Sequence, residues 1–138
     1  MVRTGADRLL TEPAITRLVR DRAWGLVCHQ ASIDAEGRHL FDVVCGEPSL
    51  RPRVIFAPEH GLFGEFRYME AVPDRVDPRL GVHVRSLYGN DFRSLAPAVA
   101  DLAGLDLVVF DLQDVGARYY TYLATMAQIG RASCRERV

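Results

Sequence analysis

The sequence contains no lysine, and all 17 of its basic residues are arginine. Together with 18 acidic residues they give a formal net charge of −1. This balance excludes an electrostatic basis for binding nucleic acid or an anionic membrane. No apolar run reaches the roughly 20 residues of a membrane-spanning helix. Residues 1–22 interrupt their apolar positions with charges every few residues, which excludes a typical signal peptide.

Cysteine is also scarce. Cys28, Cys45 and Cys134 are odd in number and widely spaced, which argues against a disulfide framework and a zinc site. The first predicted strand is followed by neither a GxGxxG motif nor a phosphate-binding loop, so a nucleotide site is disfavoured. HxH and HExxH spacings are absent as well. We therefore predict no cofactor and no metal. The residues that in principle offer metal ligands are His29, His60, His83, Asp111 and Asp114.

Four apolar runs predict strands, and they are Trp24–Cys28, Val54–Ala57, Val82–Leu87 and Leu105–Leu112. The first, second and fourth are nearly continuous, which is typical of strands buried on both faces of a parallel sheet. The third alternates between apolar and polar residues, which suits a strand nearer an edge.

Helical patterns fill the gaps between these runs. They cover Asp7–Arg20 with a kink at Pro13, then Arg38–Cys45, Ser94–Ala103 and part of Tyr119–Ala127. The alternating order predicts an α/β fold, with a Rossmann-like, open and mainly parallel sheet flanked by helices. The length of 138 residues suits a single domain.

In such sheets, binding and catalytic sites lie beyond the carboxyl ends of the strands. Polar residues follow every predicted strand of this sequence. The segments are Cys28-His29-Gln30, Pro58-Glu59-His60-Gly61, Tyr88-Gly89 and 113–118 ("QDVGAR"). The sequence therefore predicts a functional site at this end of the sheet.

The pair Glu59-His60 is the first candidate. Taken alone, it fits a helix cap followed by a satisfied imidazole, and that structural interpretation is favoured for an isolated Glu-His. Glu65 lies on the same glycine-rich loop and changes the balance. Two carboxylates above a sheet can serve as an acid–base pair, or as one acid and one acceptor for a sugar hydroxyl.

The segment after the fourth predicted strand holds the second set of candidates. Asp111 lies in an apolar run, where a carboxylate is costly unless paired, and Arg118 is an available partner. A structural ion pair and a functional role both remain open for Asp111. We expect Asp114 and Arg118 to face a ligand. Tyr119, Tyr120 and Tyr122 are interpreted as core residues or as a platform for a sugar ring, with core favoured for any single one.

Several stretches together resemble the DUF1343 family, the exo-β-N-acetylmuramidases of the NamZ type. They are "GLVCHQASIDAEGRHLFDVV", "VIFAPEHGLFGEFRYMEAVPDRVD", "VHVRSLYG" and "GLDLVVFDLQDVGARYYTYLATM". The resemblance extends from about Asp7 to Ala127. It implies a glycoside hydrolase that removes terminal N-acetylmuramic acid from the non-reducing end of peptidoglycan fragments. It also implies a Rossmann-like N-terminal domain and a smaller C-terminal domain, with the cleft between them.

The resemblance also implies roles for individual residues. Glu59 is the expected general acid–base, and His60 is expected to orient it. His29, Glu65, Asp114, Arg118 and Tyr120 are expected to bind substrate, which would be a muropeptide or a peptidoglycan-derived disaccharide. Cys28-His29 stands where the family usually has Thr-Asn. Two alternatives stay open, namely a non-catalytic muropeptide-binding module and a metal-dependent hydrolase.

The end of the sequence differs in character from the rest. Ile129–Val138 ("IGRASCRERV") matches a translation of common short-read sequencing-adapter DNA, and Gln128 fits the join. We therefore predict that residues 1–127 form a partial Rossmann-like N-terminal domain, that residues 128–138 are an adapter-derived tail, and that the C-terminal domain is missing.

Overall fold

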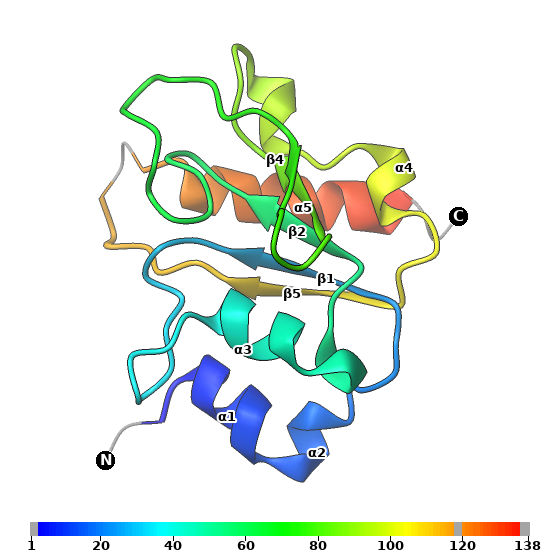
Figure 1. Cartoon of the computed structure of the whole chain (residues 1–138). Coiled ribbons are helices and arrows are strands. Elements are labelled where there is room, and N and C mark those ends of the chain that lie inside the picture. Colours follow the sequence, from blue (N-terminus) through cyan, green and yellow to red (C-terminus); the bar gives the residue numbers. More distant parts are fainter. Residues whose placement is uncertain (1–2, 118–119, 136–138) are drawn as a thin grey trace.

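The computed structural model of the protein describes residues 3–117 and 120–135. It contains one sheet of five strands in the order β3-β4-β2-β1-β5 (Figure 1). The strands are β1 (Trp24–Cys28), β2 (Val54–Ala57), β3 (Arg75–Val76), β4 (His83–Ser86) and β5 (Leu107–Asp111). All pairings are parallel except that of β3 with β4. The predicted α/β class and mainly parallel sheet are confirmed.

The strand bounds agree closely with the prediction. β1 and β2 match their predicted runs residue for residue, and β4 and β5 lie within theirs. β4 is separated from the sheet edge only by β3, which the sequence did not predict. The two residues of β3 are half-buried Arg75 and exposed Val76, so this edge strand has no apolar pattern to reveal it.

The helices before β5 are shorter than predicted, whereas α5 is longer. The helices are α1 (Gly5–Thr11), α2 (Pro13–Thr16), α3 (Leu40–Gly46), α4 (Val99–Leu102) and α5 (Tyr122–Arg135), with 3-10 turns η1 (Pro48–Leu50) and η2 (Phe92–Leu95). The kink predicted at Pro13 is confirmed, because proline separates α1 from α2. The single helix predicted over 94–103 is wrong, because Pro97 lies between η2 and α4 and cannot donate a helical hydrogen bond.

Two apolar cores cover the two faces of the sheet. Leu26 and Ile55 pack with α1 and α3, whereas Val27 and Phe56 pack with α4 and α5. Successive side chains of a strand point to opposite faces, so both sets of helices are held by the same two strands. β1 and β2 are buried throughout, as predicted.

β5 departs from the prediction of a fully buried strand. All five of its residues are only partly buried. The reason is its position at the end of the sheet, where it pairs with β1 on one side and with no other strand among the residues described.

Helix α5 crosses the boundary predicted between residues 127 and 128. Ile129 is 7% exposed and packs in the same core as Val27 and Phe56. The origin of residues 128–138 stays a prediction.

Candidate functional site

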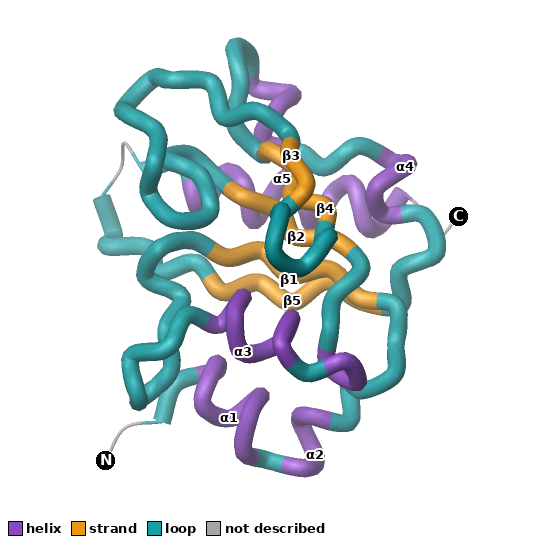
Figure 2. The backbone as a smooth tube through the Cα atoms, in the orientation of Figure 1, coloured by secondary structure: helices purple, strands orange, loops and turns teal. Residues whose placement is uncertain are grey.

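The four parallel strands end at one edge of the sheet, where loops follow β1, β2 and β5 (Figure 2). His29 comes directly after β1, Glu59 two positions after β2 and Tyr88 two positions after β4. Gln113 stands at the matching position after β5. The topology thus brings the predicted polar segments together at the carboxyl ends of the strands, which is where ligands bind in open α/β sheets.

Glu59 is the most buried acidic side chain among the predicted site residues, with 7% exposure. It lies in a turn closed by the Gly61 amide, which donates to the Pro58 carbonyl at 3.0 Å. Glu59 Oε2 accepts a hydrogen bond from Thr121 Oγ1 at 3.0 Å. Glu59 Oε1 is buried and has no hydrogen-bond partner in the part of the chain described. One carboxyl oxygen is therefore held, and the other is left without a hydrogen-bond partner among the described residues.

Two phenols lie close to this carboxylate. Burial is the main cause that raises the pKa of Tyr88 and of Tyr122. Glu59 raises the pKa of Tyr88 further through hydrogen bonding and charge, and that of Tyr122 through charge. Each phenol consequently keeps its proton across the physiological range. The site thus combines one acidic group with two neutral hydroxyl groups.

His60 closes the loop that follows Glu59. It has a positive φ of 73°, its ring Nδ1 lies 3.0 Å from the Phe66 carbonyl, and the Phe66 amide donates to the His60 carbonyl at 3.1 Å. The hydrogen bond seen for this ring goes to Phe66 and not to Glu59. A role for His60 in orienting Glu59 would therefore act through the loop.

Glu65 anchors the same loop to the sheet. Its Oε1 lies 2.6 Å from an Arg75 guanidinium nitrogen on β3, and its Oε2 accepts from the Phe63 amide at 2.7 Å. A β-carbon at Gly61 would lie 2.7 Å from Glu65 Oε2, so the close approach requires glycine. Both carboxyl oxygens of Glu65 are engaged within the protein, unlike those of Glu59.

His29 is 3% exposed and begins a chain of polar contacts that leads through the exposed Gln113 to the partly buried Asp111. Its Nε2 is 2.5 Å from Gln113 Oε1, while Gln113 Nε2 donates to Asp111 Oδ1 at 3.3 Å. The amide group of Gln113 therefore turns its oxygen towards His29, and this short contact favours a proton on Nε2, whereas the Gln113 backbone amide lies farther from the same nitrogen, at 3.4 Å. Nδ1 is then the acceptor for the Tyr122 hydroxyl at 3.3 Å. Burial is the main cause that lowers the pKa of His29, which favours this neutral tautomer.

Asp111 ends β5 with a carboxyl group that is only partly satisfied. Burial raises its pKa, and Oδ2 is buried without a partner in the described segments. Ser32 Oγ donates to the Asp111 carbonyl at 2.6 Å and fixes the backbone there. Arg118, the partner expected from the sequence, lies outside the described residues.

The remaining predicted contacts lie on the segment after β5. Asp114 is exposed, and its Oδ1 accepts from the Gly116 amide at 2.6 Å. Tyr120 is 38% exposed, with its ring edge-on to Tyr122 at 5.7 Å between centroids. Thr121 was missed, because a threonine before an apolar helix carries no catalytic signal. Its importance comes only from the three-dimensional contact with Glu59.

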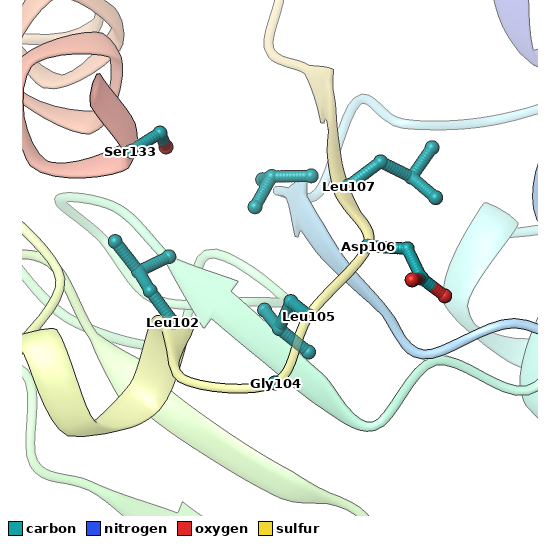
Figure 3. Close-up of a pocket in the computed structure, with 7 residues that line it drawn as sticks. Leu102, Gly104, Leu105, Asp106, Leu107 and Ser133 are labelled. Carbon is teal, nitrogen blue, oxygen red and sulfur yellow. The ribbon is translucent and has the colours of Figure 1, made fainter. Parts of the chain in front are cut away.

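The structure also bears on other kinds of site. Within residues 3–117 and 120–135, no three His, Cys, Asp or Glu residues lie together as metal ligands, and no helix is long and apolar enough to span a membrane. A separate hollow lies at the opposite end of β5, among side chains from α4, β5 and α5 (Figure 3). Its lining residues are Leu102, Gly104, Leu105, Asp106, Leu107, Val108 and Ser133. None of the polar residues that follow the carboxyl ends of the strands is among them.

Comparison with known proteins identifies the family. A family model described as the N-terminal part of exo-beta-N-acetylmuramidase NamZ matches residues 24–138. The chain belongs to the NamZ family. A curated NamZ relative, the peptidoglycan beta-N-acetylmuramidase NamZ of Bacillus subtilis (strain 168), is 34% identical over 126 residues. That match covers 91% of this chain and 29% of the relative.

Solved structures of NamZ relatives agree with the fold. Two crystal structures of DUF1343 family proteins from Bacteroides fragilis NCTC 9343 match with TM-scores of 0.81 and 0.72, at 25% and 24% sequence identity. Each match covers 98% of this chain and 32% of the solved chain. The chain therefore spans about a third of the length of these relatives. The family resemblance inferred from the sequence is confirmed.

Proposed function

We propose that this chain is the N-terminal part of a glycoside hydrolase that removes terminal N-acetylmuramic acid from the non-reducing end of peptidoglycan fragments. The observation that carries the proposal is the state of Glu59, a buried carboxyl group with one anchored and one unpartnered oxygen at the ligand-binding edge. The name of the Bacillus subtilis relative supports the choice of a muramidase.

Glu59 acts as the general acid. Its proton passes to the glycosidic oxygen while the bond from that oxygen to the anomeric carbon breaks, so the leaving sugar departs as an alcohol. Water then supplies the hydroxyl group at the anomeric carbon, and its released proton balances the reaction. Burial keeps bulk water away from the carboxyl group, which strengthens its interaction with the developing charge.

Other residues bind the sugar or hold the loops of the site in place. Tyr120, with its partly exposed ring, and the exposed Asp114 contact the sugar, together with Arg118. Glu65 holds the loop through Arg75, and the buried His29 holds Tyr122. The substrates are muropeptides or peptidoglycan-derived disaccharides.

The complete gene product carries out this reaction, and the 138-residue chain does not. The relatives are about three times as long, and the carboxyl edge provides only one wall for a substrate. An open wall neither excludes water nor holds the sugar in line with Glu59, and such positioning supplies much of the rate enhancement of an enzyme.

The test is hydrolysis by the complete gene product of a disaccharide with N-acetylmuramic acid at its non-reducing end. Release of N-acetylmuramic acid is expected, with no release from the matched disaccharide that carries N-acetylglucosamine at that end. A chelator should leave the rate unchanged, whereas inhibition would favour the metal-dependent alternative. Tight binding of the first disaccharide without hydrolysis would instead identify a binding module.

A further inference from the structure

We infer that Thr121 is the residue that positions Glu59, by holding Oε2 so that Oε1 is the oxygen that carries and delivers the proton. The inference rests on the proposed function for its chemistry. It names a role for a residue to which the sequence analysis assigned none.

The contact joins two distant parts of the chain. Thr121 and Glu59 are 62 positions apart, and Thr121 Oγ1 donates to Glu59 Oε2 at 3.0 Å. Thr121 comes directly before α5, whereas Glu59 lies in the turn after β2. The start of α5 therefore sets the orientation of a carboxyl group that belongs to another loop.

Thr121 is itself held in place. Its carbonyl accepts two hydrogen bonds from Thr125, one from the amide at 2.9 Å and one from Oγ1 at 3.1 Å. Thr125 is fully buried, so this first turn is fixed to the core on the α5 side of the sheet. A hydroxyl on such a support holds Glu59 with little freedom, which is what a catalytic group requires.

The hydrogen bond also distinguishes the two carboxyl oxygens. A hydroxyl that donates to Oε2 leaves that oxygen as an acceptor, so the proton of the neutral acid resides on Oε1. Oε1 has no competing partner in the described part of the chain. The proton is thus placed on the oxygen that Thr121 does not engage.

The experiment compares Thr121→Val, Thr121→Ser and the control Thr16→Val in the complete gene product. Valine keeps the branched shape and removes the hydroxyl group, and serine retains the donor. Thr16 lies on α2 and is buried, and its hydroxyl donates only to the Leu9 and Glu12 carbonyls. Its variant therefore measures the effect of removing a buried threonine hydroxyl outside the site. Each protein is assayed on the muramyl disaccharide and on an aryl muramide whose acidic phenol leaves without a proton.

If Thr121 positions the acid, Thr121→Val lowers kcat for the disaccharide by about tenfold or more, since misplaced catalytic groups cost up to about a hundredfold. KM should change little, and kcat for the aryl muramide should fall by less than about threefold, because that substrate does not need the acid. Thr121→Ser should restore the disaccharide rate, and Thr16→Val should affect both substrates equally. Equal losses on both substrates in Thr121→Val would overturn the inference.

A crystal structure of Thr121→Val provides a readout that does not depend on activity. The Glu59 carboxyl group should rotate away from the position it has beside Thr121. An unchanged Glu59 would overturn the positioning role even if the enzyme is a muramidase. Conversely, the proposed function would be refuted if the wild-type gene product released no N-acetylmuramic acid. A rotated Glu59 in Thr121→Val would then still support the positioning role.

Discussion

The Nδ1 atom of His29 lies 3.3 Å from the phenol oxygen of Tyr122, although the two residues are 93 positions apart. This contact ties the end of β1 to the start of α5, and Tyr122 in turn lies close enough to Glu59 to sense its charge. The contact makes the neutral form of a buried histidine part of the site's architecture.

The first prediction concerns pH. Because burial lowers the pKa of His29, the unfolded chain binds more protons than the folded protein between that lowered value and about 6.5. The stability attributable to His29 is therefore complete above about pH 6.5 and is lost as the pH falls through this window. Thermal midpoints of the complete gene product at pH 8 and pH 5.5 measure the effect. His29→Gln should reduce the difference, whereas His83→Gln, at an exposed position on β4, should leave it unchanged. Identical differences in both variants would contradict this assignment.

The second prediction concerns Glu59. Glu59→Gln in the complete gene product should lower disaccharide hydrolysis by about 10²–10⁴-fold, because an amide cannot donate the required proton. Glu65→Gln is the matched control, because Glu65 is engaged by Arg75 and the Phe63 amide. The loss of hydrolysis rate in Glu65→Gln should be much smaller. Residual activity within about threefold of wild type, which corresponds to under about 1 kcal/mol of barrier, would remove Glu59 from the mechanism.

The third prediction separates backbone strain from a steric clash in the catalytic loop. Gly61 and Gly37 have similar positive φ values, 81° and 75°, so alanine is strained at both. Only at Gly61 would the new methyl group meet Glu65 Oε2 and the Phe66 ring, at 2.7 and 2.8 Å. Both variants should lose stability in urea denaturation, by about 1 kcal/mol or more from the backbone alone. Gly61→Ala should lose more and should also lower kcat. Equal stabilities and equal rates would show that the loop yields without cost.

The fourth prediction concerns the core. A β-carbon at Gly25 would lie 2.9 Å from the Phe56 ring and 3.2 Å from Leu105, inside the packed face of β1. Gly25→Ala should therefore destabilise the protein by about 1–3 kcal/mol, as overpacking typically does. Gly5→Ala is the control, because no atom lies within 4 Å of its added methyl group at the start of α1. Alanine there should be neutral or stabilising by up to about 1 kcal/mol. Chemical denaturation of both variants provides the comparison.

The fifth prediction concerns the 138-residue chain expressed alone. β5 forms an unpaired edge among the described strands, and an apolar groove runs beside it, lined in part by Leu9, Leu18 and Val109. Exposed edges of this kind promote association between chains. We expect aggregation in light scattering and no hydrolysis of the disaccharide. A soluble monomer that melts cooperatively and matches the rate of the complete gene product would refute this expectation.

The sequence predicted the central strands well because continuous apolar runs and parallel burial go together, as β1 and β2 show. It missed β3, which has two residues and no buried valine, and this omission hid the partner of Glu65. Without β3, nothing in the sequence indicates that Arg75 would engage the carboxylate that was expected to bind a sugar.

The candidate site was predictable to the level of its loops but not of its contacts. Glu59 stood out because Glu65 shares its glycine-rich loop and because that loop resembles one of a known family. Thr121 did not, because a threonine acquires its role only when α5 is placed against the turn after β2. Long-range side-chain contacts of this kind depend on tertiary packing, which local patterns do not encode.

The placement of β5 beside β1 has a consequence for the order of events during synthesis. β1 is the first strand to emerge from the ribosome, yet its second neighbour is the last, as the hydrogen bond from the Ala23 amide to Asp106, 83 positions later, illustrates. Until β5 has been synthesised, one side of β1 has no strand to pair with. Such distant pairings fold slowly, and nascent chains with unpaired strands are prone to misassemble. The nascent protein should accordingly depend on a chaperone until Asp111 has left the exit tunnel.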